Sequence, residues 1–244
     1  MQARTITDAS QALQGKTAGV QLSGSAGPGG QATVRIRGVG SNGASDPLYV
    51  IDGRIAKSIR GIDPNDIESM EVLKDGASAA IYGASAGNGV ILITTKKGKG
   101  AGQIKYDMQI TRQSIARTPE LMDSEEFINY YVKESNIIAQ SVIDQNWDGK
   151  TSTNWIDELF ETSMMQRHNV TFSAGSDKGS IYLSGSYLDN NGTVKGNQDT
   201  FRRLTGMINA TWKIKPWLDV MTNNQISHMK IQSVGEGSEY GSTF

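Results

Sequence analysis

The stretch DPNDIESMEVLKDGASAAIYGASAGNGVILITTKKGK, residues 63–99, decides the fold predicted for this chain. Two of its segments are strand-like, Glu71–Lys74 and Val90–Lys96, and the residues between them are mainly Ala, Gly and Ser. Asp63 stands directly before a proline. This order predicts a short helix over Pro64–Ser69, because proline is favoured at the first helical position. Short strands and helices in succession indicate a small mixed domain.

Further short elements are predicted in the residues before this stretch. Ala9–Ala18 has the spacing of a short helix, with Ser10 placed to cap it. Ala32–Arg37 alternates apolar and polar residues and predicts a strand, as does Leu48–Asp52. The polar loop Gly38–Asp46 lies between these two strands and contains a G-x-G-x-x-G pattern. A strand follows it where a dinucleotide site would need a helix, which argues against nucleotide binding.

The residues after 100 follow a different pattern, in which apolar and polar side chains alternate with period two. This alternation is typical of strands that bury one face. It predicts five strands, centred on residues 104–110, 170–174, 181–187, 204–214 and 218–226. The long link between the first two strands contains a predicted helix, Ser124–Ile138, with Ser124 as its cap.

The links between these strands alternate in length. Tight turns at Ser176–Gly179 and Lys215–Pro216 are separated by long connections at residues 113–166 and 190–200. In outer-membrane barrels, short periplasmic turns alternate with long outer loops. Trp212 and Trp217 flank one short turn, as an interfacial aromatic belt would. Because a soluble antiparallel sheet also alternates, the links and tryptophans favour the membrane without deciding it.

The composition argues against several classes of chemistry. The chain has no Cys, which excludes disulfides and thiolate nucleophiles. Its 24 Lys and Arg are balanced by 25 Asp and Glu, so net charge gives no indication of nucleic-acid binding. The two histidines, His168 and His228, lie far apart, without acidic neighbours at metal-ligand spacing. We therefore predict no metal, no cofactor and no catalytic residue.

The first hundred residues resemble a known family. Three further pieces precede the opening stretch in order: ALQGKTAGVQL at 12–22, VRIRGVGS at 34–41 and DPLYVIDG at 46–53. Together these four pieces resemble the plug domain of the SusC/RagA-like TonB-dependent outer-membrane transporters. The strands after residue 100 occur where that family places its barrel.

The resemblance implies a fold class: an α+β plug domain at residues 1–100, followed at 101–244 by antiparallel strands of an incomplete transmembrane β-barrel. A plugged barrel of about 22 strands needs several hundred more residues than these. We therefore expect an N-terminal fragment, in which the segment that binds TonB is absent. The first ten residues, MQARTITDAS, lack the apolar core of a signal peptide, so a processed or truncated chain is expected.

The resemblance also implies residues that hold the plug in place. Plug arginines of TonB-dependent transporters pair with acidic residues on the barrel wall, and Arg35 and Arg37 alternate with apolar residues so as to share one strand face. By resemblance, these two arginines form a plug–barrel latch. Ordinary surface charge at an edge strand is the alternative for both.

A second group of residues is expected to face the substrate. In this family the loop after the Arg37 strand points toward the outer vestibule. Its polar side chains could then hydrogen-bond a ligand, or simply stabilise a turn. The residues concerned are Ser41, Asn42, Ser45 and Asp46.

The resemblance implies active uptake of a large polar nutrient, such as an oligosaccharide or peptide, across the bacterial outer membrane, with the plug as gate. The partners it implies are a SusD-like surface lipoprotein, TonB and outer-membrane lipid. Two other functions remain open: a non-transport binding or assembly component, and a soluble enzyme. An enzyme would need convergent acid–base or metal residues, and the sequence displays none.

Overall fold

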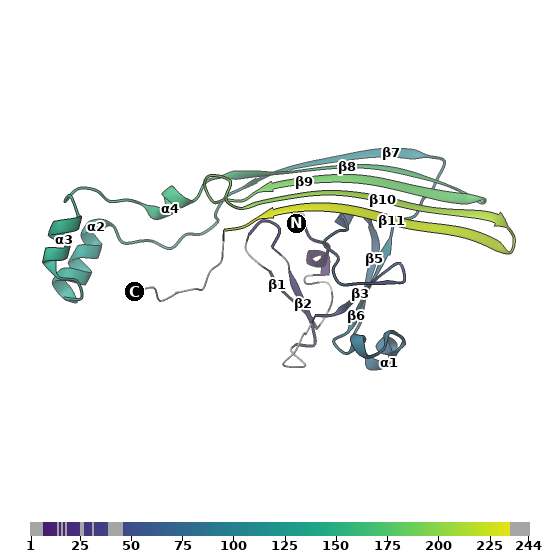
Figure 1. The fold of residues 1–244 in the computed structure, drawn as a ribbon, viewed down its shortest axis with the longest axis horizontal. Helices are drawn as coiled ribbons and strands as arrows, with labels where there is room; N and C mark the ends of the chain where they lie inside the picture. Colours follow the sequence, from purple (N-terminus) through teal and green to yellow (C-terminus); the bar gives the residue numbers. More distant parts are fainter. Residues whose placement is uncertain are drawn as a thin grey trace.

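The computed structural model describes residues 7–13, 15, 17, 19–24, 27–30, 32–38 and 46–234, which form two bodies of β-structure (Figure 1). The described residues up to Gly98, here called the N-terminal unit, contain two small sheets and several short helices. The residues from Gln103 build one five-stranded sheet, here called the wall. The N-terminal unit lies against one face of the wall (Figure 1).

The N-terminal unit is built from short elements. Its strands are β1 (Val20–Ser23), β2 (Thr33–Ile36), β3 (Leu48–Ile51), β4 (Arg54–Ala56), β5 (Ile67–Leu73) and β6 (Val90–Thr95). Its helices are the single α-helical turn α1 (Gly76–Ala79) and the 3₁₀ turns η1 (Ala9–Leu13), η2 (Pro64–Asp66), η3 (Ala80–Tyr82) and η4 (Ala84–Ala86). β1 pairs with β2, and the other strands form a four-stranded sheet in the order β4-β3-β6-β5.

A tight hairpin fixes one edge of the four-stranded sheet. β3 and β4 are joined by Asp52 and Gly53, whose φ angles of 47° and 83° are those of a type I′ turn. The Asp52 carboxylate also accepts a hydrogen bond of 2.9 Å from the backbone N–H of Thr95 in β6. β3 and β6 run parallel, with Leu48 opposite Val90. The hairpin is therefore tied to the strand that leads toward the wall.

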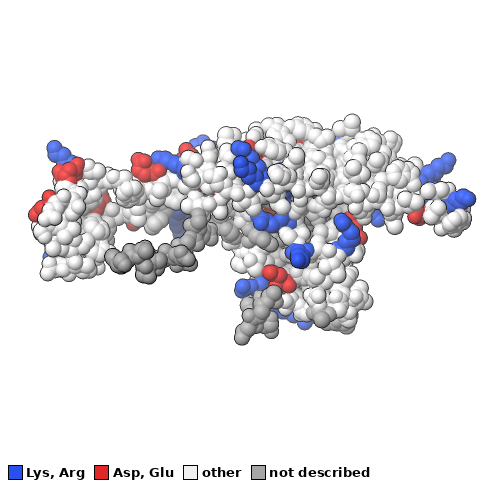
Figure 2. All heavy atoms as spheres, viewed as in Figure 1, with Lys and Arg blue, Asp and Glu red and all other residues white. Residues whose placement is uncertain are grey.

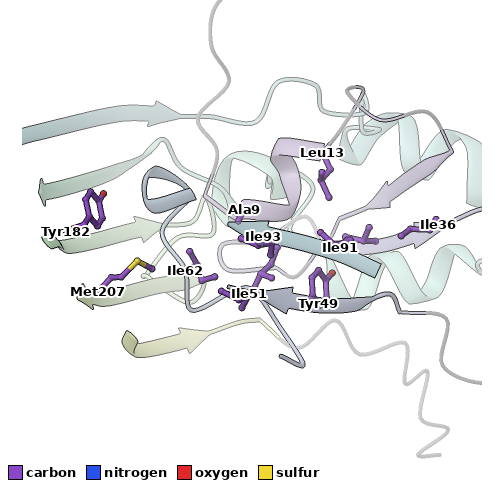
Figure 3. Close-up of a cluster of buried hydrophobic side chains, with 12 residues drawn as sticks. Ala9, Leu13, Ile36, Tyr49, Ile51, Ile62, Ile91, Ile93, Tyr182 and Met207 are labelled. Carbon is purple, nitrogen blue, oxygen red and sulfur yellow. The ribbon is translucent and has the colours of Figure 1, made fainter. Parts of the chain in front are cut away.

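The four-stranded sheet is covered on both faces. Ile91 and Ile93 of β6, at most 1% exposed, pack in a core that includes Tyr182 and Met207 of the wall (Figure 3). Val90, on the other face of the same strand, packs with small residues of α1 and η4. A strand buried on both sides is continuously apolar, which explains the run of four apolar residues at the start of β6.

The wall consists of five long antiparallel strands in sequence order. They are β7 (Gln103–Gln113), β8 (Ser163–Ser176), β9 (Gly179–Asn191), β10 (Thr200–Lys215) and β11 (Leu218–Gln232). In β10, Leu204, Ile208 and Trp212 are exposed on the face away from the N-terminal unit, while Arg203 and Asn209 are buried on the facing side. The predicted antiparallel strands are confirmed, and each observed strand extends further because its polar ends interrupt the alternation.

The link between β7 and β8 projects beyond the end of the wall (Figure 1). It contains α2 (Ser124–Ile128), the π-helix η5 (Asn129–Glu134), α3 (Gln140–Asn146) and α4 (Trp155–Leu159). No helix in the described part of the chain is both long and apolar enough to cross a membrane.

The prediction of one helix over Ser124–Ile138 is wrong in its end and in its cap. The helix ends at Glu134, and Asn136 adopts a left-handed φ of 50° that no helix continues through. The cap is Asp123, whose carboxylate accepts from the backbone N–H of Glu126 at 2.8 Å, while the Glu126 side chain accepts from the Asp123 N–H. This capping box satisfies two N-terminal donors, and Ser124 instead donates to the carbonyl of Thr151.

The helix predicted over Pro64–Ser69 is also shorter than expected. Asp63 caps η2 through a hydrogen bond from the backbone N–H of Asn65, so the predicted start is confirmed. From Ile67 onward, however, the chain pairs with β6, because Ile67 lies opposite Thr95 and the sheet takes these donors and acceptors. Tertiary pairing here outweighs the local helical preference.

Two more N-terminal predictions need correction. The helix predicted over Ala9–Ala18 is a 3₁₀ turn that ends at Leu13, and Gly15 has a left-handed φ of 72°. The strand predicted over Ala32–Arg37 ends at Ile36, since Arg37 itself has φ 61° and leaves the extended conformation. The two arginines therefore do not continue along one strand face.

Candidate functional site: the interface between the N-terminal unit and the wall

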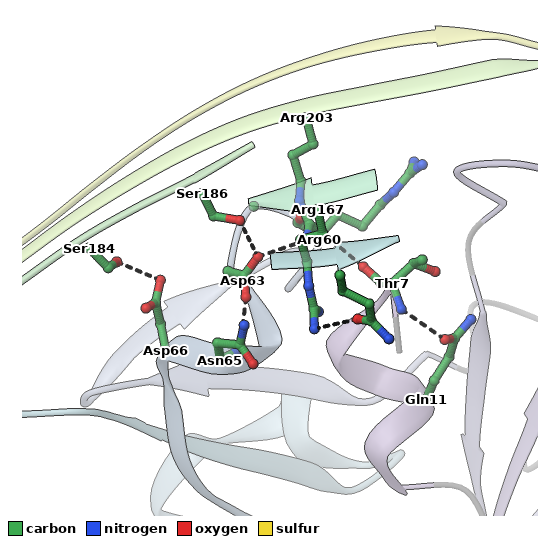
Figure 4. A network of polar contacts seen from close by, with 12 residues as sticks. Thr7, Gln11, Arg60, Asp63, Asn65, Asp66, Arg167, Ser184, Ser186 and Arg203 are labelled. Carbon is green, nitrogen blue, oxygen red and sulfur yellow. Dashed lines mark hydrogen bonds and ion pairs between the residues drawn. The ribbon is translucent and has the colours of Figure 1, made fainter. Parts of the chain in front are cut away.

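Two buried carboxylates of the N-terminal unit face the wall. Asp63 and Asp66 stand at the two ends of the η2 turn and are 0% and 1% exposed. A single helical turn brings both side chains to the same side, where the wall strands β9 and β10 pass (Figure 4). Buried charge is costly unless it is paired and hydrogen-bonded, so the partners of these two residues define the interface.

Asp63 forms an ion pair with the wall. Its Oδ2 lies 3.6 Å from Nη2 of Arg203 on β10, whose side chain is 2% exposed. The same oxygen accepts a hydrogen bond of 2.6 Å from Ser186 on β9, and Oδ1 accepts from the Asn65 N–H at 2.8 Å. At 3.6 Å the guanidinium attracts the carboxylate electrostatically, while the hydrogen bonds to that carboxylate come from the serine and the backbone.

Arg203 joins two separate segments of the N-terminal unit, the one at Thr7 and the loop from Arg60 to Asp63. Besides its contact with Asp63, its Nη1 donates to the carbonyl oxygens of Thr7 and Arg60, each at 3.1 Å. Arg60 in turn donates to the carbonyl of Gly29. A planar guanidinium offers several donors in a fixed arrangement, which suits it to gathering carbonyls from different loops. Loss of this one side chain would release all three contacts.

Asp66 is held to the wall by hydroxyl groups. Its two carboxylate oxygens accept from Tyr182 at 2.9 Å and from Ser184 at 2.7 Å, both on β9. Burial raises the pKa of Asp66, and the nearby Asp63 raises it further, while the two hydroxyls act in the opposite direction. Among the described residues no ion pair involves this carboxylate, although the positive charge of Lys96 also lowers its pKa.

Uncharged amides complete the attachment. Asn209 of β10 donates to the Thr95 hydroxyl at 2.8 Å and to the Lys96 carbonyl at 2.9 Å, and Gln225 of β11 donates to the carbonyl of Gly61 at 2.5 Å. Where the chain leaves the N-terminal unit, a Cβ on Gly98 would clash with the backbone of Ala174 and Ile181. The linker therefore lies directly on the wall.

Known proteins share both the sequence and the fold of this plug-like unit and its adjoining strands. Residues 1–90 match the family model of the TonB-dependent Receptor Plug Domain. TonB-dependent receptor P39 of Formosa agariphila is 34% identical over 96% of this chain and 23% of its own length. TonB-dependent receptor SusC of Bacteroides thetaiotaomicron is 36% identical over 83% of this chain and 21% of its length. The RagAB peptide transporter superposes with a TM-score of 0.84 and 31% identity, covering 97% of this chain and 30% of that one.

This chain belongs to the SusC/RagA-like TonB-dependent transporters. Its N-terminal unit is the plug domain, and the antiparallel strands of the wall follow it, as predicted. The chain spans less than a third of the length of these relatives.

The two arginines predicted to latch the plug are found in different settings. Arg35 lies on β2, and its Nε is buried without a hydrogen-bond partner in the described structure. Arg37 pairs with Asp75 of the plug itself at 2.5 Å, with both side chains largely exposed. Among the described residues, no ion pair joins either arginine to the wall. The buried pair that does cross the interface has the opposite polarity, with the carboxylate on the plug and the arginine on the wall.

The predicted substrate-facing loop is mostly beyond what the structure describes. Ser41, Asn42 and Ser45 lie outside the described residues. Asp46 has an exposed side chain, and its carbonyl accepts a long hydrogen bond of 3.5 Å from Asn88. The structure therefore places only the last residue of this loop.

No metal site is found among the described residues, where no group of three or more potential ligands converges. His168 contacts the hydroxyl of Tyr106 through Nδ1 at 2.7 Å, on adjacent wall strands. His228 lies opposite Leu204 in the register of β10 and β11.

The raised pKa of Asp66 predicts that acidification strengthens docking of the plug. A raised pKa means that the docked plug holds this proton more tightly than the free plug does. The resulting stabilisation is fully present below the ordinary carboxyl pKa and is lost as pH rises through the raised value. The measurement is the urea concentration that releases the plug of the full-length protein, between about pH 4 and pH 7.

The control for this pH dependence is Asp66→Asn, which keeps the shape and removes the titration. As the pH falls, the urea concentration that releases the plug should rise for the original protein relative to the Asp66→Asn variant. A difference that stays constant across the range would contradict the assignment of the titrating group to Asp66.

Proposed function

We propose that this chain forms the gate and the first wall strands of an outer-membrane transporter that imports a large polar nutrient in a TonB-dependent way. The observation that supports the proposal most is the buried polar network around Asp63, Asp66 and Arg203. Polar contacts can be exchanged for contacts with water at modest net cost, so a plug attached in this way can leave the wall under load. The function requires no catalytic step.

The proposal includes a division of the chain and a set of partners. Residues 1–100 form the plug and residues 101–244 the first barrel strands, located in the bacterial outer membrane with the plug in the lumen. A SusD-like surface lipoprotein would deliver the nutrient, and TonB would pull on the plug. Two relatives support this reading, the TonB-dependent receptor SusC and the RagAB peptide transporter. Either an oligosaccharide or a peptide would fit as the nutrient.

The proposal is tested by uptake. A strain that lacks the complete gene is grown on a panel of single oligosaccharides and peptides, and uptake of each labelled compound is measured. We expect uptake of one class to be lost and to return on complementation. A gene carrying the exposed loop substitution Lys150→Glu, far from the plug, serves as the matched control and should complement fully. Unchanged uptake of every compound in the deletion strain would contradict the proposal.

A further inference from the structure

The two ends of the wall differ in charge. The helical link at residues 114–162 carries ten Asp and Glu against three Lys and Arg. The end with the short turns is instead rich in Lys, and Figure 2 shows basic side chains at that end of the sheet. Its charged residues are Lys97, Lys99, Lys178, Lys213 and Lys215 against Glu68, Asp177 and Asp219. An anionic ligand is therefore favoured at the short-turn end.

A hollow of about 430 Å³ lies at this end of the wall. Ile181 and Trp212 supply its large apolar lining, and Lys178 is the one charged residue among the described residues that line it. Much of the rest is glycine, alanine and serine, contributed by the linker and by the turn between β8 and β9. Trp212 is 51% exposed and lies on the face away from the plug, together with Ile208 and Leu204. The hollow therefore opens onto the apolar outer face of the wall.

The backbone around the hollow is fixed. The N–H of Lys178 donates to the Ser176 hydroxyl at 3.3 Å, and its carbonyl accepts from the N–H of Lys213 at 2.9 Å. A Cβ on Gly179 would come within 3.2 Å of the Trp212 ring and closer still to the carbonyl of Thr211. The ring thus packs on the bare glycine, which keeps the aromatic wall of the hollow in place.

The position of the hollow matches the edge of an apolar band. From Leu204 to Ile214 the exposed face of β10 is apolar. At about 3.3 Å per residue this is roughly 33 Å of strand, which at a tilt of about 40° rises roughly 25 Å, the height of the apolar band of transmembrane barrels. Beyond Leu204 the same face carries the ion pair of Arg202 with Asp189. At the short-turn end, exposed Ile214 is the last apolar residue of this face, so Trp212 lies just inside the boundary. In the same region, Lys215 lies 5.7 Å from the ring of Trp217. Tryptophan and lysine together are typical of a lipid headgroup level.

We propose that this hollow binds one anionic phospholipid of the inner leaflet, with its phosphate at Lys178 and an acyl chain along Trp212 and Ile181. This inference rests on the proposed insertion of the wall in the outer membrane. Lys178 is the one charged residue that lines the hollow in the described structure, whereas Lys213, next to Trp212 on β10, belongs to the opposite face of the strand. The carboxylate of Asp177 belongs to the same turn but does not line the hollow in the described structure.

The test counts lipids on the full-length protein. The protein is reconstituted with equal amounts of phosphatidylglycerol and phosphatidylethanolamine, and the lipids retained after release are counted by native mass spectrometry. Lys178→Glu is expected to lower retained phosphatidylglycerol by at least about fivefold, because losing one lysine near an anionic lipid surface has that effect and the new carboxylate adds repulsion. Ala174→Phe should lower it similarly by filling the hollow without changing charge. Lys150→Glu, the same charge change in the helical link, should have no effect.

The outcomes separate this site from the proposed function. If all variants insert as heat-modifiable barrels and retain the same amount of phosphatidylglycerol, the lipid site is wrong and the transporter proposal is unaffected. If the two lipids are retained equally by the original protein, preference for an anionic headgroup is likewise contradicted. If the original protein fails to insert into bilayers at all, both proposals fail together.

Discussion

Replacing Arg203 with alanine is expected to open the gate even when TonB does not pull on the plug. The substitution leaves Asp63 buried opposite an empty site and removes the contacts to Thr7 and Arg60. Breaking a buried pair by removing one partner costs about 3 kcal/mol or more, which corresponds to roughly a hundredfold shift away from the docked plug. Passive entry of a bulky antibiotic into cells that express the full-length variant should rise accordingly.

The neighbouring residue provides the control for this result. Arg202 lies on the opposite face of β10 and forms a more exposed ion pair with Asp189. Such pairs contribute about 0–1 kcal/mol, so Arg202→Ala should leave antibiotic entry unchanged. The double variant Asp63→Asn with Arg203→Met removes both charges, and it should leak less than Arg203→Ala because no lone carboxylate remains. Equal entry with Arg203→Ala and Arg202→Ala would contradict a gate held at this pair.

The same assay tests the latch predicted at Arg35 and Arg37. We propose that Arg35, with its unpartnered buried Nε, pairs with an acidic group of the barrel in the full-length transporter. Arg35→Glu should then raise antibiotic entry, whereas Arg37→Glu should have little effect because its partner, Asp75, is on the plug and exposed. Unchanged antibiotic entry with Arg35→Glu would contradict a role for Arg35 in the latch.

The main strands and turns could be predicted because each of them follows from a local sequence pattern. The wall strands bury one face and expose an apolar one, and that asymmetry appears directly as alternation along β10. β6 is apolar at four successive positions because both of its faces are covered. The turn at Asp52–Gly53 was predictable for a similar reason, since few residue pairs tolerate two left-handed conformations in succession.

The interface could not be predicted in the same way, because its residues come together only in the folded chain. Asp63 could be recognised as the start of a helical turn, but its pairing with Arg203 joins residues 140 positions apart. The one available signal was that Arg203 falls on the polar side of an alternating strand, where any plug contact would have to lie. By contrast, the sequence predicts Arg37 to be a strand residue, whereas in the structure its positive φ places it outside β2.

In the proposed transporter, the plug must move away from the wall at Asp66 for import to occur. Because the chain has no Cys, a pair of introduced cysteines can tie the two bodies together at one defined place. The side chains of Asp66 and Ser184 are 2.7 Å apart, so Asp66→Cys with Ser184→Cys places two thiols across the interface. Thr171→Cys with Ser184→Cys is the matched control, since those residues are opposite each other on β8 and β9 within the wall.

Uptake of the labelled nutrient by the oxidised Asp66→Cys/Ser184→Cys transporter, with the cross-link confirmed by intact mass, is the most direct measurement. We expect import to stop in the oxidised state and to return when the disulfide is reduced, while the control pair imports in both states. Import at the original rate through a fully cross-linked plug would show that the plug need not leave the wall at Asp66, and would contradict the gate described here.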